Sequence, residues 1–208
     1  MTEQMNVPKL RFNEFDAEWD ITTLGELCAP PSYGLNSAAI AYDGENKYIR
    51  ITDIDEEKRT FLPKPLSSPD SYDDAFLLKS GDIVFARTGA SVGKSYLYKK
   101  TDGKLYFAGF LIKFSITKAR PEFVFNQTLT NKFYNWVRVM SVRSGQPGIN
   151  ANEFSTYPVV IPSIPEQQKI ASFLSTVDKK IDLLTEKKAK LTEYKKGVMQ
   201  QLFNGSFR

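Results

Sequence analysis

Apolar residues in the C-terminal part of the chain recur at alternating spacings of four and three residues. This is the pattern of a helix that packs one face against another helix. Ten positions from Ile170 to Leu202 follow the spacing without a slip, and among them only Lys188 and Lys195 are not apolar. The helix could fold back on its own domain, but much of its length would then overhang, so we expect pairing with a second helix. The seam that would make the contact comprises Ile170, Leu174, Val177, Ile181, Leu184, Leu191, Val198 and Leu202.

The ends of this helix carry their own signals. Ser163-Ile164-Pro165-Glu166 matches a capping box with proline in the first turn, and Asn204-Gly205 is a stop signal. We therefore expect a helix over 166–203. The same signals mark the clearest boundary in the sequence, between a globular domain at 1–162 and a helical region at 163–208.

The first 162 residues show mostly short strand patterns. Residues 47–54 alternate in the strand manner, 121–142 have helical spacing, and 73–79 could form a short helix. Further apolar strands are expected at 83–86, 95–98, 105–108, 110–116 and 157–161. Because strands and helices do not alternate regularly, we predict an α+β fold, a mixed globular domain followed by one long C-terminal coiled-coil helix.

Composition narrows the possible chemistry. The chain of 208 residues has no histidine and one cysteine, Cys28. These counts exclude a Ser-His or Cys-His nucleophile, an internal disulfide and a histidine-containing zinc site. No apolar run of about 18 residues occurs, and no basic-then-apolar leader stands at the N-terminus, so we expect a cytoplasmic protein.

Charge is distributed unevenly. Residues 1–86 hold eight Lys/Arg against sixteen Asp/Glu, whereas residues 87–150 hold eleven Lys/Arg against two acids, Asp102 and Glu122. This asymmetry predicts an acidic face and a basic face, and a basic face is typical of nucleic-acid binding. The alternative is that folding interleaves the two sets into neutral pairs.

Two glycine-rich loops lie in the basic segment. Arg87–Ser95 and Arg143–Asn150 combine glycines that allow close backbone approach, hydroxyl groups, and cations or amides suited to base edges and phosphates. From these residues alone, two interpretations of the loops remain open: they recognise DNA or RNA, or they are ordinary Gly- and Ser-rich turns. The candidate DNA-binding residues are Arg87, Thr88, Ser91, Lys94, Arg143, Ser144, Gln146 and Asn150.

Three segments look catalytic, and each departs from the motif it suggests. Gly89–Ser95 has three residues between its glycines where a phosphate-binding P-loop requires four. Ala29-Pro30-Pro31-Ser32 lacks the amide or carboxylate and the aromatic residue of an amino-methyltransferase loop. Acidic residues at 53–57 could hold magnesium, but acids on a turn are usually solvated. We therefore predict no catalytic residue and no metal site.

Taken together, the motifs resemble the specificity subunit of type I restriction-modification systems. The Pro-x-x-Pro-Glu-Gln-x-x-Ile entry to the helix is the most specific part of a resemblance that covers nearly the whole chain. It rests on Pro8-Lys9-Leu10-Arg11-Phe12, Trp19, Thr23-Leu24-Gly25, the stretch 48–54, Gly81-Asp82-Ile83-Val84, Arg87-Thr88-Gly89, Ser144-Gly145-Gln146 and the stretch 162–170.

The resemblance implies a non-catalytic target recognition domain that binds double-stranded DNA. It also implies a helical spacer that docks methyltransferase subunits and serves a motor-nuclease subunit in host defence. No cofactor is expected on this chain, because S-adenosylmethionine, ATP and magnesium belong to the partner subunits. Two functions stay open beside this one: a stand-alone DNA-binding or decoy protein of the same fold, and a cryptic enzyme.

The chain departs from the family pattern in carrying one recognition domain and one helical region where the family typically repeats both. We therefore expect a half-length subunit. Two copies are expected to associate as a homodimer through antiparallel C-terminal helices and so to direct DNA methylation to a two-part target.

Overall fold

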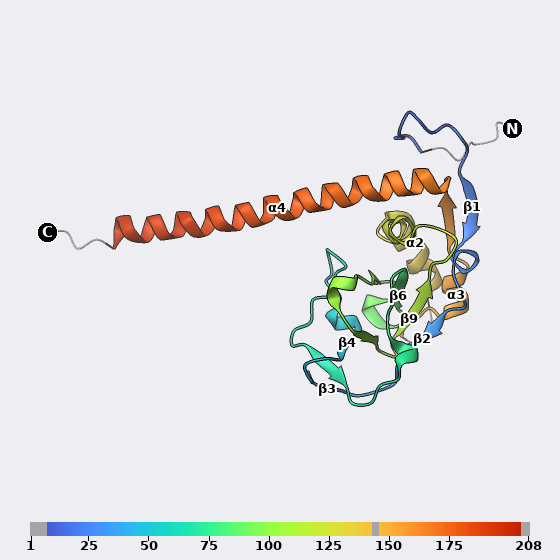
Figure 1. Cartoon of the computed structure of the whole chain (residues 1–208), viewed down its shortest axis with the longest axis horizontal. Helices are drawn as coiled ribbons and strands as arrows, with labels where there is room; N and C mark the ends of the chain where they lie inside the picture. Colours follow the sequence, from blue (N-terminus) through green and yellow to red (C-terminus); the bar gives the residue numbers. More distant parts are fainter. Residues whose placement is uncertain (1–7, 143–145, 205–208) are drawn as a thin grey trace. The chain divides into compact units, whose positions relative to one another are not determined.

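The structure is a computed structural model that describes residues 8–142 and 146–204. It divides into two compact units, Met1–Gln168 and Lys169–Arg208, which are described separately. The first unit mixes short strands and helices, and the second consists of most of the long helix α4 (Ile164–Phe203) (Figure 1). The expected α+β class is confirmed.

A four-stranded antiparallel sheet forms the centre of the globular unit. Its order is β2 (Ser32–Tyr33), β9 (Leu111–Ser115), β6 (Asp82–Ala86) and β7 (Ser95–Leu97). Three of these strands confirm the apolar runs expected at 83–86, 95–98 and 110–116. β6 is buried along its whole length, because Ile83 and Phe85 face one apolar cluster while Val84 and Ala86 face another.

Three two-stranded pairs surround this sheet. β1 (Asp20–Thr23) pairs antiparallel with β10 (Pro158–Ile161), β3 (Ala39–Ala41) pairs antiparallel with β5 (Ser67–Pro69), and β4 (Lys47–Ile49) pairs parallel with β8 (Leu105–Phe107). The strands expected at 105–108 and 157–161 are confirmed as β8 and β10.

The strand expected over 47–54 is too long. It ends at Ile49, and Ile51–Asp53 forms a 3-10 turn. The Asp53 carboxylate accepts hydrogen bonds from both the backbone N and the side chain of Arg50. Such local side-chain bonds offer the backbone an alternative to the sheet ladder.

The single helix expected over 121–142 is two helices, α1 (Pro121–Gln127) and α2 (Asn131–Met140). The hydroxyl of Thr130 accepts from the Phe133 backbone N and starts the second helix. A further helix, α3 (Ala151–Ser155), was not expected. The short helix proposed at 73–79 is a 3-10 turn at Asp74–Phe76, and other such turns lie at Gly25–Leu27, Gly89–Ser91 and Lys100–Asp102.

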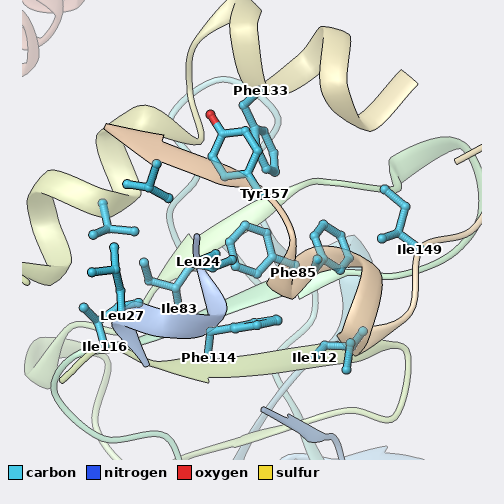
Figure 2. Packing of buried hydrophobic residues seen from close by; sticks show 14 of the residues in the cluster. Leu24, Leu27, Ile83, Phe85, Ile112, Phe114, Ile116, Phe133, Ile149 and Tyr157 are labelled. Carbon is cyan, nitrogen blue, oxygen red and sulfur yellow. The ribbon is translucent and has the colours of Figure 1, made fainter. Parts of the chain in front are cut away.

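The main core is an aromatic cluster around Phe85 (Figure 2). The Phe85 ring lies 5.0 Å from the Phe154 ring, 5.6 Å from Phe114 and 5.9 Å from Phe133, measured between centroids. These rings come from β6, α3, β9 and α2, so one cluster joins the sheet to the helices.

Helix α4 confirms the helix expected over 166–203 and begins two residues earlier. Glu166 was expected to complete a capping box with Ser163. In the structure its buried carboxylate has other donors: Arg11 Nε and Nη2, each at 2.8 Å, and Trp19 Nε1 at 3.3 Å. Glu166, at the entry to the helix, therefore binds the N-terminal segment of the globular unit.

Five of the eight seam residues of α4 are exposed in the single chain, and Ile170, Leu174 and Val198 are half-buried. Exposed fractions are 52% for Ile181, 57% for Leu184, 58% for Leu191 and 69% for Leu202. Within the part of the chain that the structure describes, no helix combines the length and apolarity needed to cross a membrane.

Candidate nucleic-acid interface

The structure joins the two glycine-rich loops of the basic segment. Gly89 N donates to Pro147 O at 2.9 Å, and Ile149 N donates to Arg87 O at 2.9 Å. Thr88 and Gly148 form an antiparallel bridge between these bonds. The two loops, which are far apart in the sequence, therefore form one continuous surface.

An open groove of about 980 Å³ lies beside this junction. It brings together three of the predicted residues, Arg87, Thr88 and Gln146. The rest of its lining comes from three segments of the chain: Tyr33–Ser37 with Ala39, Tyr48 with Arg50–Thr52, and the turn Ala108–Phe110.

Arg87 is held at both its backbone and its side chain. Its backbone N donates to Phe110 O at 3.1 Å, and its Nε donates to Gly109 O at 3.1 Å. The guanidinium carbon lies 5.2 Å from the centre of the Tyr33 ring and 5.7 Å from that of Phe110. Among the described residues, Nη1 and Nη2 of Arg87 have no hydrogen-bond partner, so the end of the guanidinium is free to bind.

Tyr48 and Arg50, which also line the groove, are fixed by hydrogen bonds of their own. The Tyr48 hydroxyl donates to Leu35 O at 2.8 Å and Ser37 O at 3.1 Å, and burial raises the pKa of this tyrosine. The Arg50 guanidinium binds Asp53 through two nitrogens, and this hydrogen bonding raises the pKa of Arg50. Arg50 is thus neutralised by its own turn, unlike Arg87.

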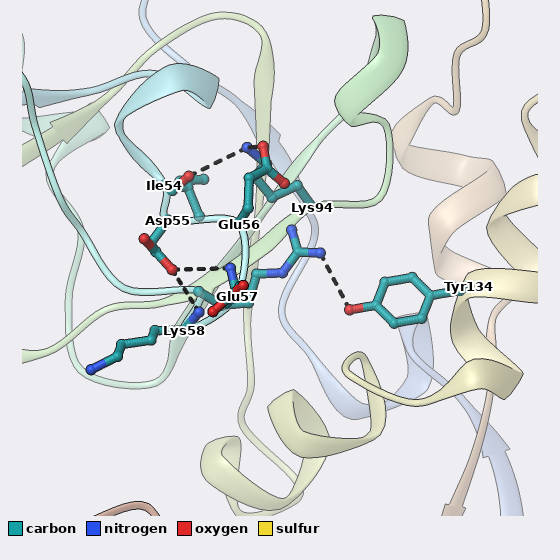
Figure 3. Close-up of polar contacts among 8 residues, drawn as sticks. Ile54, Asp55, Glu56, Glu57, Lys58, Lys94 and Tyr134 are labelled. Carbon is teal, nitrogen blue, oxygen red and sulfur yellow. Dashed lines mark hydrogen bonds and ion pairs between the residues drawn. The ribbon is translucent and has the colours of Figure 1, made fainter. Parts of the chain in front are cut away.

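Lys94 corrects one expectation. We expected it to contact DNA from the first loop, but the structure leaves it 5% exposed. Its ammonium donates to Ile54 O at 3.3 Å and forms an ion pair with the Glu56 carboxylate (Figure 3). A buried ammonium needs such partners, so Lys94 stabilises the 54–56 turn and is not available to a phosphate.

The other predicted residues fall into three groups. Ser91 lines a smaller hollow next to Lys94 and Glu56. Asn150 caps helix α3, because its Oδ1 accepts from Glu153 N at 2.9 Å and its N donates to the Glu153 carboxylate at 2.8 Å. Arg143 and Ser144 lie outside the residues that the structure describes.

Charge separation is weaker in the fold than along the sequence. Lys94 pairs with Glu56, and Lys104 pairs with Glu45 at 3.1 Å. Both pairs join the basic segment to the acidic N-terminal half. At these positions the interleaving alternative is correct, and the groove depends on a few placed side chains more than on a general basic field.

The acidic run at 53–57 is engaged by protein groups. Asp53 binds Arg50, Glu56 binds Lys94, and Asp55 accepts from the backbone N of Lys58 and of Glu57. The hydrogen bond from Lys58 is the main cause that lowers the pKa of Asp55. Over residues 8–142 and 146–204, no cluster of three or more potential metal ligands occurs.

Sequence reasoning missed Tyr33 and Phe110. Both are large exposed aromatics, at 44% and 61%, and each stands beside a glycine, Gly34 or Gly109. That pairing was the available signal, because glycine lets two backbones approach closely.

Gly34 is where the groove wall depends most on glycine. A Cβ at this position would lie 2.1 Å from Ala108 O and 2.6 Å from Phe107 O. We expect Gly34→Ala to lower the free energy of unfolding by about 1–3 kcal/mol or more, since backbone must shift to relieve the overlap. Urea unfolding measures the change.

Gly109→Ala is the matched control, because the contacts of its added Cβ begin at 3.4 Å. It should change stability far less than Gly34→Ala. Equal urea-unfolding midpoints for wild type and Gly34→Ala would show that Gly34 does not pack against the Phe107–Ala108 backbone as described.

The sequence profile described as "Type I restriction modification DNA specificity domain" matches residues 16–193. A curated relative, the type I restriction enzyme MjaVIII specificity subunit of Methanocaldococcus jannaschii, is 23% identical over 214 residues. That alignment covers 99% of this chain and 50% of the relative. The chain thus spans about half the length of the curated relatives it matches.

Solved structures share the fold. The HsdS subunit from Thermoanaerobacter tengcongensis superposes with a TM-score of 0.64 at 18% identity, covering 88% of this chain and 48% of that one. A chain from a study of complex assembly and conformational transition of the type I R-M system superposes with a TM-score of 0.67 at 14% identity, covering 100% and 49%.

Proposed function

Since the chain belongs to the type I restriction-modification DNA specificity domain family, we propose that its globular unit reads a short sequence of double-stranded DNA. Specificity subunits are non-catalytic. One observation carries the proposal. Gln146 is far from Arg87 and Thr88 in the sequence, yet all three line one groove, and among the described residues the ends of their side chains make no hydrogen bonds. Polar groups that the fold leaves unused are available to bases and phosphates.

We further propose that recognition of this DNA sequence directs methyltransferase and motor-nuclease subunits to it. Those subunits would bring S-adenosylmethionine, ATP and magnesium. We assign no cofactor to this chain. We propose that this complex acts on DNA in the cytoplasm. Co-purification with a methyltransferase subunit would support this role. Specific DNA binding without any such partner would favour the stand-alone or decoy alternative.

The exposed seam of α4 supports a two-copy assembly. A parallel pair in register would set Lys188 and Lys195 opposite their own copies, whereas an antiparallel pair sets them against other residues or at the rim. We therefore propose an antiparallel homodimer. Its two-fold symmetry would make the target an inverted repeat.

The test is selection of bound duplexes from a randomised pool by the full chain, followed by affinity measurements on the enriched sequence. Wild type should enrich a defined motif. Gln146→Ala should weaken the preference at one position by about 5- to 150-fold, since glutamine suits a bidentate contact with adenine.

Arg138→Ala is the control, because it removes a charge from the exposed side of α2, away from the groove lining. It should keep the motif. If wild type binds all sequences equally, the recognition proposal is wrong. If Gln146→Ala keeps full preference at every position, the second loop does not read bases.

A further inference from the structure

We infer that Arg87 is the residue that selects guanine in the target, and that Tyr33 and Phe110 are positioning residues that hold its guanidinium. This inference rests on the proposed function and names the base chemistry of that site. It depends on three features: how Arg87 is held, what it leaves free, and how it differs from the other cation in the groove.

Arg87 is held by segments that are themselves tied together. Gly109 N donates to Leu35 O at 2.8 Å, and Gly34 N donates to Leu111 O at 3.1 Å, so the Tyr33 segment is fixed to the turn that carries Phe110. The Tyr33 hydroxyl accepts from Ala151 N at 3.2 Å, which anchors this ring at its far end. The two rings near Arg87 therefore belong to a built frame.

This frame gives a reason for the exposure of the Phe110 ring to solvent. Phe110 is 61% exposed on a tight turn, where a polar residue would be easier to solvate. Its ring and that of Tyr33 lie near the Arg87 guanidinium, an arrangement that favours the cation and restricts the rotamers of its side chain. An arginine restricted in this way loses less freedom when it binds.

The free atoms match guanine. Arg87 donates a hydrogen bond from Nε to Gly109 O, and this leaves Nη1 and Nη2 as a pair of parallel donors. Guanine presents O6 and N7 as adjacent acceptors in the major groove, and a bidentate arginine contact is the commonest specific pairing with this base. The same two donors could also bind a phosphate, and the two contacts differ in that only the guanine contact depends on the base sequence.

Arg50 shows the contrast within the same groove. It lines the groove too, but Nε and Nη2 are bound to Asp53. Among the described lining residues, Arg87 is thus the cation whose terminal nitrogens are both free. The difference assigns base reading to Arg87 and a structural role to Arg50.

The experiment compares wild type with Arg87→Lys and Phe110→Leu on duplexes that carry each base at each position of the selected motif. Wild type should prefer a G·C pair at one position. Arg87→Lys should reduce that preference by about 5- to 150-fold and leave the other positions unchanged, because the charge remains but the fork is lost. Phe110→Leu should reduce the same preference to a smaller extent.

Replacing that guanine with 7-deazaguanine tests the atom itself. The loss of N7 should weaken wild-type binding and should have little further effect on Arg87→Lys, since the contact is already gone. Arg138→Lys is the matched control and should respond to 7-deazaguanine as wild type does. Unfolding midpoints of all variants confirm that the folded state is being compared.

Two outcomes would overturn the inference. A uniform loss of affinity across all sequences in Arg87→Ala, with the slope of log affinity against log salt reduced by about 0.9, would make Arg87 a phosphate contact and leave the proposed function intact. A motif in which no position responds to Arg87→Lys would also overturn it. Failure of wild type to select any motif would refute the proposed function and the inference together.

Discussion

Phe85→Ala is expected to lower the free energy of unfolding by about 3–5 kcal/mol. The side chain is fully buried and touches three other rings, from α3, β9 and α2. Truncation leaves a cavity at the junction of sheet and helices, where four elements would have to move together to close it. A domain of this size has a total stability of about 5–15 kcal/mol, so the variant should lose a large fraction of it. Urea unfolding followed by circular dichroism measures the loss.

Phe110→Ala is the matched control for that experiment, since it removes the same ring from an exposed turn. It should cost less than about 1 kcal/mol. If the two substitutions cost the same, Phe85 is not the centre of the core that the structure shows.

A double substitution of Ile181 and Leu184 with aspartate is expected to convert the proposed homodimer to monomers. These side chains are about half exposed in the single chain, at 52% and 57%, so a partner helix would complete their burial. Loss of this burial in both copies, at about 1.5 kcal/mol for each side chain before the added charge is counted, should raise the dimer dissociation constant by at least 100-fold. Sedimentation equilibrium measures it, and recognition of a two-part DNA site should be lost with it.

Leu183→Asp is the matched control, because Leu183 is 67% exposed but lies off the seam. It introduces a single aspartate on a different face of α4 and should leave the dimer intact. A wild-type chain that stays monomeric at tens of micromolar, with DNA and methyltransferase present, would contradict the two-copy proposal.

Local patterns determined the long helix and the central strands. The four-three spacing of α4 and the apolar runs of β6, β7 and β9 are visible in the sequence, because helix and strand periods are properties of neighbouring residues. The two glycine-rich loops were found for the same reason, since their composition is local. The family motifs, such as the Pro-x-x-Pro-Glu-Gln entry to α4, are also short and contiguous.

Pairing between distant segments was decided only by the tertiary structure. β1 and β3 are short and largely exposed, so neither has an apolar period to reveal it, and each exists because β10 or β5 offers hydrogen bonds. The break between α1 and α2 depends on one threonine cap inside a helical pattern. Such features follow from non-local geometry or from a single side-chain bond.

The candidate site divides in the same way. Arg87, Thr88 and Gln146 could be chosen from residue type, whereas Lys94 could not be excluded, because its burial depends on Glu56 and Ile54 some forty residues earlier. Tyr33 and Phe110 became part of the site only when the Gly34 and Gly109 backbones were brought together. Sequence determined which chemical groups were available, and the fold decided which of them face a common groove, because burial and adjacency are set by contacts between residues far apart in the chain.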